Sequence, residues 1–291
     1  MVRVLDGLHP TAKQVLERTH GVWLADHLQD AAAVYFPCDM APGGTRGGFV
    51  LLDAGEYPFD LDLQDVDVPV LYWQALAGVP LDEPFAASWD RGRGSQPVRR
   101  GDHAMRYLLL HELGHALSLY AGEFELAPTG RFQVERTDGF LRFSWRLAPS
   151  LSSRGAARHP VVAAAGVAPK VSLSLLEWAS VLDALDADPA LLSPAALFWV
   201  HPTSRQRARR VCRAATKLTR AGFVTPAAAL YPTEDYAETF AHAILAAEQR
   251  LSPHDRIHLD LPHCGAREIR APFFSPWITA KRRYLQIALG L

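Results

Sequence analysis

The sequence predicts an α+β domain in which a mixed sheet from the N-terminal half packs against a buried helix, while the C-terminal half is mainly helical. Three observations support this fold class. Strand-like runs follow the glycine-rich turn at residues 43–48, an uninterrupted, mostly apolar run covers residues 105–117, and helical patterns dominate from about Val171 onward. The 291 residues contain ample apolar side chains for a sizeable core.

We expect one domain with three parts. Residues 1–120 would form the sheet-containing half with the buried helix, residues 121–160 a hairpin insertion, and residues 161–291 the helical half.

The N-terminal half is expected to begin with helices and to continue with strands. Residues 8–36 predict two helical runs, the first capped by Thr11 and the second extending from Val22 to Tyr35. The strand-like segments after the turn-rich stretch are 49–52, 59–63 and 66–70.

The run at residues 105–117 contains His111-Glu112-Leu113-Gly114-His115, an H-E-x-x-H. Asp102 is a suitable N-cap for a helix here, and no proline interrupts the run. On a helix, residues four apart lie on one face with Cβ atoms about 6 Å apart, so both imidazoles can reach one Zn²⁺. Glu112 would then be placed to contact a metal-activated water without being a ligand. Chance could produce the motif, but an unpaired glutamate on such an apolar helix would be costly to bury.

A catalytic zinc site needs a third protein ligand. A metzincin would carry its glycine and third histidine where this chain has Ser118 and Ala121, so that class is excluded. The best candidate is the segment 231–245, where Pro232 and Thr233, the latter as N-cap, predict the start of a helix.

Two acids lie one turn apart on that predicted helix, Glu234 and Glu238. Stacked carboxylates repel unless a cation or a donor separates them. A zinc ion and the N–H of a zinc-bound histidine would satisfy one acid each. The residues alone do not decide which glutamate is the ligand and which contacts the histidine.

The combination of H-E-L-G-H with the downstream segment Glu234 to Ala241, an E-x-x-A-E-x-F-A, resembles the gluzincin metallopeptidases. The likeness extends through His242 for lethal-factor-like peptidases and a group of bacterial zinc peptidases. It covers only these two short segments. The resemblance implies a zincin-like fold, one Zn²⁺ held by His111, His115 and Glu234, and Glu238 as the acid that orients a ligand histidine.

The chain departs from the gluzincin pattern in two respects. More than a hundred residues separate His115 from Glu234, which is a long interval for this group. Relatives often carry a tyrosine two turns before the ligand glutamate as a transition-state donor, and Ala227 stands there in this chain. Tyr231 is the nearest replacement, with Tyr236 and Tyr107 as alternatives.

The resemblance implies a zinc metallopeptidase, an endopeptidase by expectation, that acts on a protein or peptide substrate. Glu112 would be the general base for a metal-activated water, and Tyr231 would stabilise the oxyanion. Peptide-bond hydrolysis is implied by the resemblance, whereas the residues themselves imply only a metal-activated water. Two alternatives are a regulatory or binding module with little hydrolysis and a nucleic-acid-associated protease.

The nucleic-acid alternative depends on a basic segment, because charge over the whole chain is balanced at 30 Lys and Arg against 31 Asp and Glu. Residues 205–220 contain seven basic side chains and no acid, four of them in an i, i+4 stripe. A solvated helix face explains this stripe more simply than a nucleic-acid surface.

Four further expectations concern the remaining chain. Two alternating runs joined by Asp138-Gly139 predict a β-hairpin over residues 131–145. Residues 173–185 predict a helix, and the histidines between residues 254 and 263 are expected in a loop without a second metal. His242 is either a further site residue or a packed histidine.

The cellular location is expected to be the cytoplasm. The three cysteines are widely spaced with no C-x-x-C pair, which suits a reducing compartment. The N-terminus lacks the apolar core of a signal peptide, although export by another route would not need one. The richness in Ala, Arg, Pro and Asp is typical of GC-rich bacterial genomes.

Overall fold

The computed structural model describes residues 2–26, 28, 32–38, 47–53, 87–90, 100–126, 132–134, 139–147, 171–172, 176–178, 218–229, 231–261, 265–270 and 272–290. One hydrophobic core joins side chains from Val4 near the N-terminus to Leu285 near the C-terminus. Among these residues, no helix has the length and apolarity that crossing a lipid bilayer requires.

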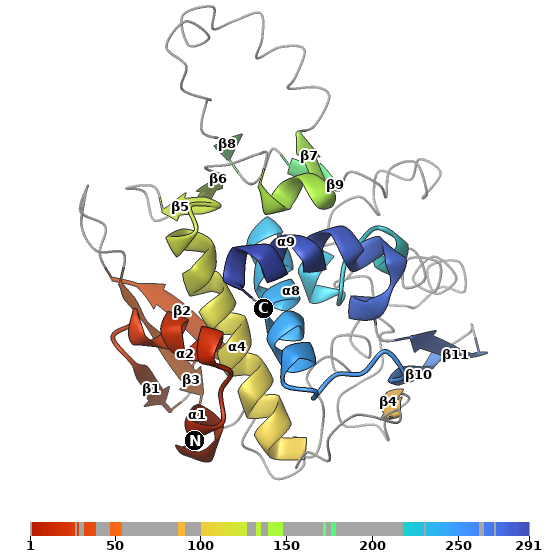
Figure 1. The fold of residues 1–291 in the computed structure, drawn as a ribbon, viewed down its shortest axis with the longest axis horizontal. Coiled ribbons are helices and arrows are strands. Elements are labelled where there is room, and N and C mark those ends of the chain that lie inside the picture. The colour runs from red at the N-terminus through yellow and green to blue at the C-terminus, as the bar shows by residue number, and fades with distance from the viewer. Residues whose placement is uncertain are drawn as a thin grey trace, which may run out of the picture.

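Helices and strands are mixed along the chain (Figure 1). The α-helices are α1 (Val2–Asp6), α2 (Pro10–Glu17), α4 (Arg100–Tyr120), α8 (Pro232–Ala247) and α9 (Thr279–Leu289). The 3₁₀ helices are η1 (Phe140–Phe143), η5 (Ala227–Ala229), η6 (Pro272–Phe274) and η7 (Pro276–Ile278). The strands are β1 (Val22–Ala25), β2 (Ala33–Pro37), β3 (Gly48–Asp53), β4 (Ala87–Asp90), β5 (Phe124–Leu126), β6 (Phe132–Val134), β7 (Trp145–Leu147), β8 (Val171–Ser172), β9 (Leu176–Trp178), β10 (Arg256–Leu261) and β11 (Gly265–Arg270).

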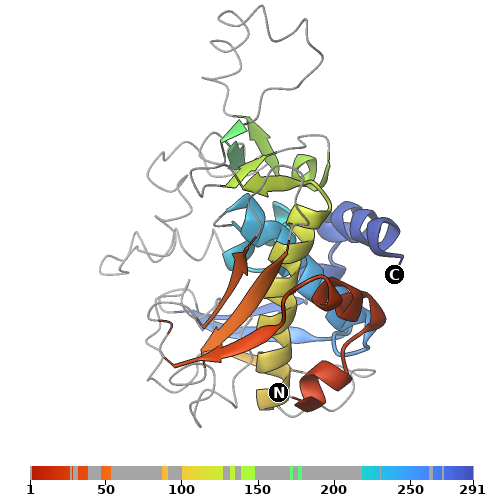
Figure 2. The same ribbon diagram turned by 90° about the vertical axis from the view of Figure 1, so that its left-hand side faces the viewer.

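Helix α4 lies between the N-terminal sheet and α8 (Figures 1 and 2). A helix that is covered on several sides must be apolar around most of its circumference, which explains the leucines of the H-E-x-x-H helix. Leu109, Leu110 and Leu113 are fully buried. The helix predicted from the motif is therefore confirmed, although it begins at Arg100, so that Asp102 lies in its first turn and is not the N-cap.

The sheet against α4 has the strand order β1-β3-β2 and is mixed, since β1 pairs with β3 in parallel and β2 pairs with β3 antiparallel. Its inner face buries Tyr35, Val50 and Leu52. β3 agrees with the strand expected at 49–52, whereas the expected strands at 59–63 and 66–70 lie outside the described residues.

The helix expected from Val22 to Tyr35 is wrong, because this stretch contributes the strands β1 and β2. Short apolar runs rich in β-branched and aromatic residues favour strands when a partner strand is available, and β3 pairs with both. The preceding helix is present as α2, with His9 as its N-cap in place of Thr11: Nδ1 of His9 accepts a hydrogen bond from the Thr11 backbone at 3.3 Å.

Helix α8 begins at Pro232, close to the predicted start, but its N-cap is Tyr231 and Thr233 lies in the first turn. Proline suits the first helical position because its missing N–H would have no partner there. α8 runs antiparallel to α4, as two contacts show. The guanidinium of Arg106, near the start of α4, donates a hydrogen bond to Glu248 at the end of α8 at 3.0 Å. Nε2 of His115, towards the end of α4, lies 3.4 Å from the carboxylate of Glu234 at the start of α8.

The hairpin predicted over residues 131–145 is wrong. β6 pairs with β5 and β8, while residues 140–143 form η1 and β7 pairs with β9. Phe140 and Leu141 are consecutive and both buried, so this stretch does not follow the in-and-out alternation on which the hairpin prediction depends. The buried carboxylate of Glu123 also accepts a hydrogen bond from the Phe140 backbone at 3.0 Å.

Two other predictions for the C-terminal half need correction. Residues 176–178 form the strand β9 within the segment predicted to be a helix, because they pair with β7. His258 lies in the strand β10 and not in a loop. Most of the basic segment, residues 205–217, lies outside the described residues.

Candidate metal centre

The two histidines of the motif face α8 from adjacent turns of α4. Their Nε2 atoms are 3.1 Å apart, and the ring centroids are 4.7 Å apart. His111 is almost fully buried, and the side chain of His115 is 14% exposed. The pair therefore presents two nitrogen donors to one point at the α4–α8 interface.

Helix α8 brings Glu234 to the same point. Its carboxylate oxygens lie 3.1 Å from Nε2 of His111 and 3.4 Å from Nε2 of His115. One ligand atom from each of the three residues lies within 4.8 Å of the others. These are the three ligands that the gluzincin resemblance implies, and the structure brings them together.

The donor set fits a zinc ion. Tetrahedral ligands bound at about 2.0–2.1 Å stand about 3.3 Å apart. The two Nε2 atoms are 3.1 Å apart, one Glu234 oxygen lies 3.1 Å from Nε2 of His111, and the other Glu234 oxygen lies 3.4 Å from Nε2 of His115. Each of these pairs is close to the spacing of zinc ligands, and one atom from each residue lies within 4.8 Å of the others. Two imidazoles and one carboxylate are also a ligand combination found in catalytic zinc sites, with the fourth position open.

Glu238 occupies a different place from Glu234. Its Oε1 lies 2.7 Å from Nδ1 of His111, and the residue is fully buried. An acid at Nδ1 leaves Nε2 of the same ring to bind a metal, which is the usual arrangement of a histidine ligand. This geometry favours Glu234 over Glu238 as the ligand.

The protonation states of the metal-ligand candidates follow from their surroundings. Burial lowers the pKa of His115 to about 4, although Glu234 opposes the shift. Burial acts to raise the pKa of Glu234, but the two imidazoles outweigh it and lower the pKa to about 2. A neutral imidazole and an ionised carboxylate are the forms that ligate a metal.

The pKa of His111 shows that the two neighbouring carboxylates stabilise a positive charge between them. Burial acts to lower its pKa, but hydrogen bonding to Glu234 and Glu238 and their negative charges raise the pKa well above its usual value. The two carboxylates thus favour a cation between them, and a divalent metal ion meets the same electrostatic demand.

Glu112 is buried beside this cluster. Burial raises the pKa of its carboxyl to about 7, with the charge of Glu234 adding to the shift and that of His111 opposing it. A backbone hydrogen bond with Tyr35 of β2 also counteracts the shift. A carboxyl with a pKa near neutrality can both accept a proton and return it, which is the requirement for a general base that later acts as an acid.

The tyrosines considered as oxyanion donors differ in their exposure and contacts. Tyr231 is 55% exposed at the start of α8, and its proposed contact with a reacting group stays a prediction. Tyr236 is buried against Phe140, and the hydroxyl of Tyr107 donates to Glu238. Those two tyrosines are therefore engaged inside the protein, and the structure does not support them as donors to substrate.

His242 is packed inside the protein. Nδ1 of His242 lies 2.8 Å from the Glu238 backbone oxygen, and its ring contacts Tyr107 and Phe273. It supports the helix that carries the acids and does not belong to the donor cluster.

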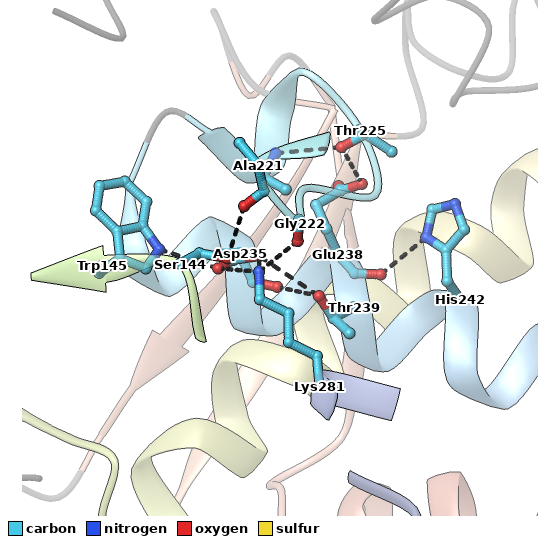
Figure 3. Close-up of polar contacts among 11 residues, drawn as sticks. Ser144, Trp145, Ala221, Gly222, Thr225, Asp235, Glu238, Thr239, His242 and Lys281 are labelled. Atoms are coloured by element: carbon cyan, nitrogen blue, oxygen red, sulfur yellow. Dashed lines mark hydrogen bonds and ion pairs between the residues drawn. The ribbon is translucent and has the colours of Figure 1, made fainter. Parts of the chain in front are cut away.

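A buried ion pair that the sequence did not reveal holds the start of α8 (Figure 3). The ammonium of Lys281 on α9 lies 2.6 Å from both carboxylate oxygens of Asp235 and donates to the Gly222 backbone oxygen at 2.7 Å. Trp145 donates to the same carboxylate at 2.9 Å. Because Asp235 follows Glu234 directly, this network fixes the first turn of the helix that supplies the third donor.

Gly114 sets the distance between the two helices. A Cβ at this position would lie 2.7 Å from Cα of Ala237 and 3.0 Å from its backbone oxygen. The end of a flexible side chain could move away from such a Cβ, but the backbone atoms of a buried helix cannot. A larger residue at this position must therefore push α4 and α8 apart.

Gly114→Ala should therefore destabilise the protein by about 1–3 kcal/mol and also weaken zinc binding, because it separates the histidines from Glu234. Denaturant unfolding and a zinc competition titration measure the two effects. Alanine is the better helix former, so greater stability with unchanged zinc affinity would show that the close approach is unimportant.

Comparison of the chain with protein-family models, with curated proteins and with solved structures gives no match. The assignment of this centre therefore rests on its own geometry and chemistry.

Proposed function

We propose that the protein is a zinc-dependent metallopeptidase of the gluzincin type with a zincin-like fold. The observation that carries this proposal is the convergence of His111, His115 and Glu234 beside the buried Glu112. A binding module would need the three ligands, but it would not need a buried acid with a pKa near neutrality next to them.

Zinc bound by these three residues would supply Lewis acidity, which activates a water molecule and polarises a substrate carbonyl. Glu112 would accept the proton of the attacking water and transfer it to the leaving amine. Glu238 would hold the ring of His111 through Nδ1, so that Nε2 keeps its direction. Tyr231 is the candidate donor to the oxyanion.

The first experiment measures zinc content and peptide hydrolysis on the same preparation. We expect one equivalent of zinc per chain, cleavage of unstructured substrates such as casein, loss of cleavage after chelation, and recovery when zinc is returned. Stoichiometric zinc without any cleavage of a broad peptide library would favour the regulatory or binding module instead.

The two acids of α8 should differ in their effect on zinc. Glu234→Ala removes a ligand and should reduce zinc to well below one equivalent, whereas Glu238→Ala leaves all three ligands and should weaken zinc affinity by about 10–100-fold. Chelator competition distinguishes these outcomes. A greater loss in Glu238→Ala would mean that the roles of the two acids are reversed.

A further inference from the structure

The carboxylate of Glu238 is held by two hydroxyl groups in addition to His111. Oε2 accepts hydrogen bonds from the hydroxyl of Tyr107 and from Oγ1 of Thr225, the latter at 2.7 Å, while Oε1 faces Nδ1 of His111. With two donors on one oxygen and the imidazole on the other, rotation of the carboxylate would break both sets of contacts.

The direction of the Thr225 hydrogen bond is fixed by a second contact. Oγ1 of Thr225 accepts a hydrogen bond from the backbone N–H of Ala228 at 3.1 Å, so its single proton is free to point at Glu238 (Figure 3). Thr225 is 1% exposed, and the residues on either side of it are buried as well. Thr225 is thus held in place by the segment that leads into η5.

The second hydroxyl comes from the metal-ligand helix itself. Tyr107 precedes His111 by one turn of α4, is fully buried, and has its ring against that of His242. The side chains of Tyr107 and His111 therefore reach one carboxylate on α8 from two successive turns of α4.

We propose that Tyr107 and Thr225 are positioning residues that hold the Glu238 carboxylate on Nδ1 of His111 and thereby direct Nε2 of His111 at the zinc position. This inference rests on the proposed function for the identity of the metal. The contact between Glu238 and Nδ1 of His111 does not require the metal, so it can be measured separately in the zinc-free protein.

The test compares substitutions that remove one hydroxyl each. Tyr107→Phe and Thr225→Val remove the donors with little change of shape, and Thr225→Ser restores the hydroxyl. The matched controls are Tyr236→Phe and Thr239→Val, which remove buried hydroxyls of α8; Thr239 donates to the Asp235 backbone oxygen and not to Glu238.

Chelator competition should give a zinc affinity about 10-fold weaker in Tyr107→Phe and in Thr225→Val, at the lower end of the range for residues that orient a ligand. Thr225→Ser and both controls should keep the wild-type affinity. Equal affinities in Thr225→Val and Thr239→Val would overturn the proposal.

The second readout is the proton on Nδ1 of His111, observed by NMR of the zinc-free protein. We expect a strongly downfield, hydrogen-bonded resonance in the wild type and in Thr225→Ser, and an upfield shift or loss in Tyr107→Phe and Thr225→Val. If the wild type binds no zinc, the proposed function fails, while this resonance still decides whether the two hydroxyls position His111. An unchanged resonance in both variants would refute the positioning role.

Discussion

Glu112→Gln should keep one equivalent of zinc and lose hydrolysis by about 10²–10⁴-fold, the usual contribution of a general acid–base residue. Glutamine has nearly the same size and keeps an oxygen for the backbone contact with Tyr35, but its amide cannot accept a proton at neutral pH. The measurement is kcat/KM on a fluorogenic peptide together with zinc content of the same sample.

The matched control is Glu17→Gln, which makes the same chemical change at an exposed position on α2. It should leave both hydrolysis and zinc content at wild-type values. Wild-type hydrolysis by Glu112→Gln would exclude Glu112 as the general base, and loss of zinc from this variant would show that Glu112 acts on the metal site and not on the substrate.

Lys281→Met should destabilise the protein by about 3–5 kcal/mol, because it leaves the buried carboxylate of Asp235 without its cation. The lysine is enclosed by the rings of Phe140 and Phe223, with 4.8 Å between Nζ and the Phe223 centroid. Methionine fits such an apolar site, so the cost arises from the unpaired acid and not from a cavity. Denaturant unfolding measures the free energy.

Two variants separate the ion pair from simple loss of a basic residue. Arg283→Met lies at an exposed position of the same helix and should change the free energy of unfolding by less than about 0.5 kcal/mol. The double variant Asp235→Asn with Lys281→Met removes both charges and should recover much of the stability. If the double variant is as unstable as the sum of the single changes, the pair is not coupled.

The parts of the site that local sequence patterns determine could be predicted. The spacing of His111 and His115 and the apolar surroundings fix a helix with both imidazoles on one face, and Pro232 fixes the start of α8 to within two residues. The close fit of Gly114 against Ala237 depends on how α4 and α8 cross, which no local pattern contains.

The features that depend on distant partners could not be predicted. The run from Val22 to Tyr35 becomes two strands because β3 lies between them, and a run of apolar residues contains no sign of that partner. Lys281 and Asp235 are separated by 46 positions in the chain, and no local pattern pairs them. The sequence leaves Tyr107 open as an alternative oxyanion donor, because the partner of its hydroxyl, Glu238, is on another helix.

X-ray absorption of the protein loaded with one equivalent of zinc tests the central claim most directly, since it reports the atoms bound to the metal. His111, His115 and Glu234 predict nitrogen and oxygen ligands at about 2.0–2.1 Å with the outer-shell scattering of two imidazoles, and one imidazole fewer in His115→Ala. A sulfur shell at about 2.3 Å, or a spectrum that His115→Ala leaves unchanged, would contradict the proposed centre.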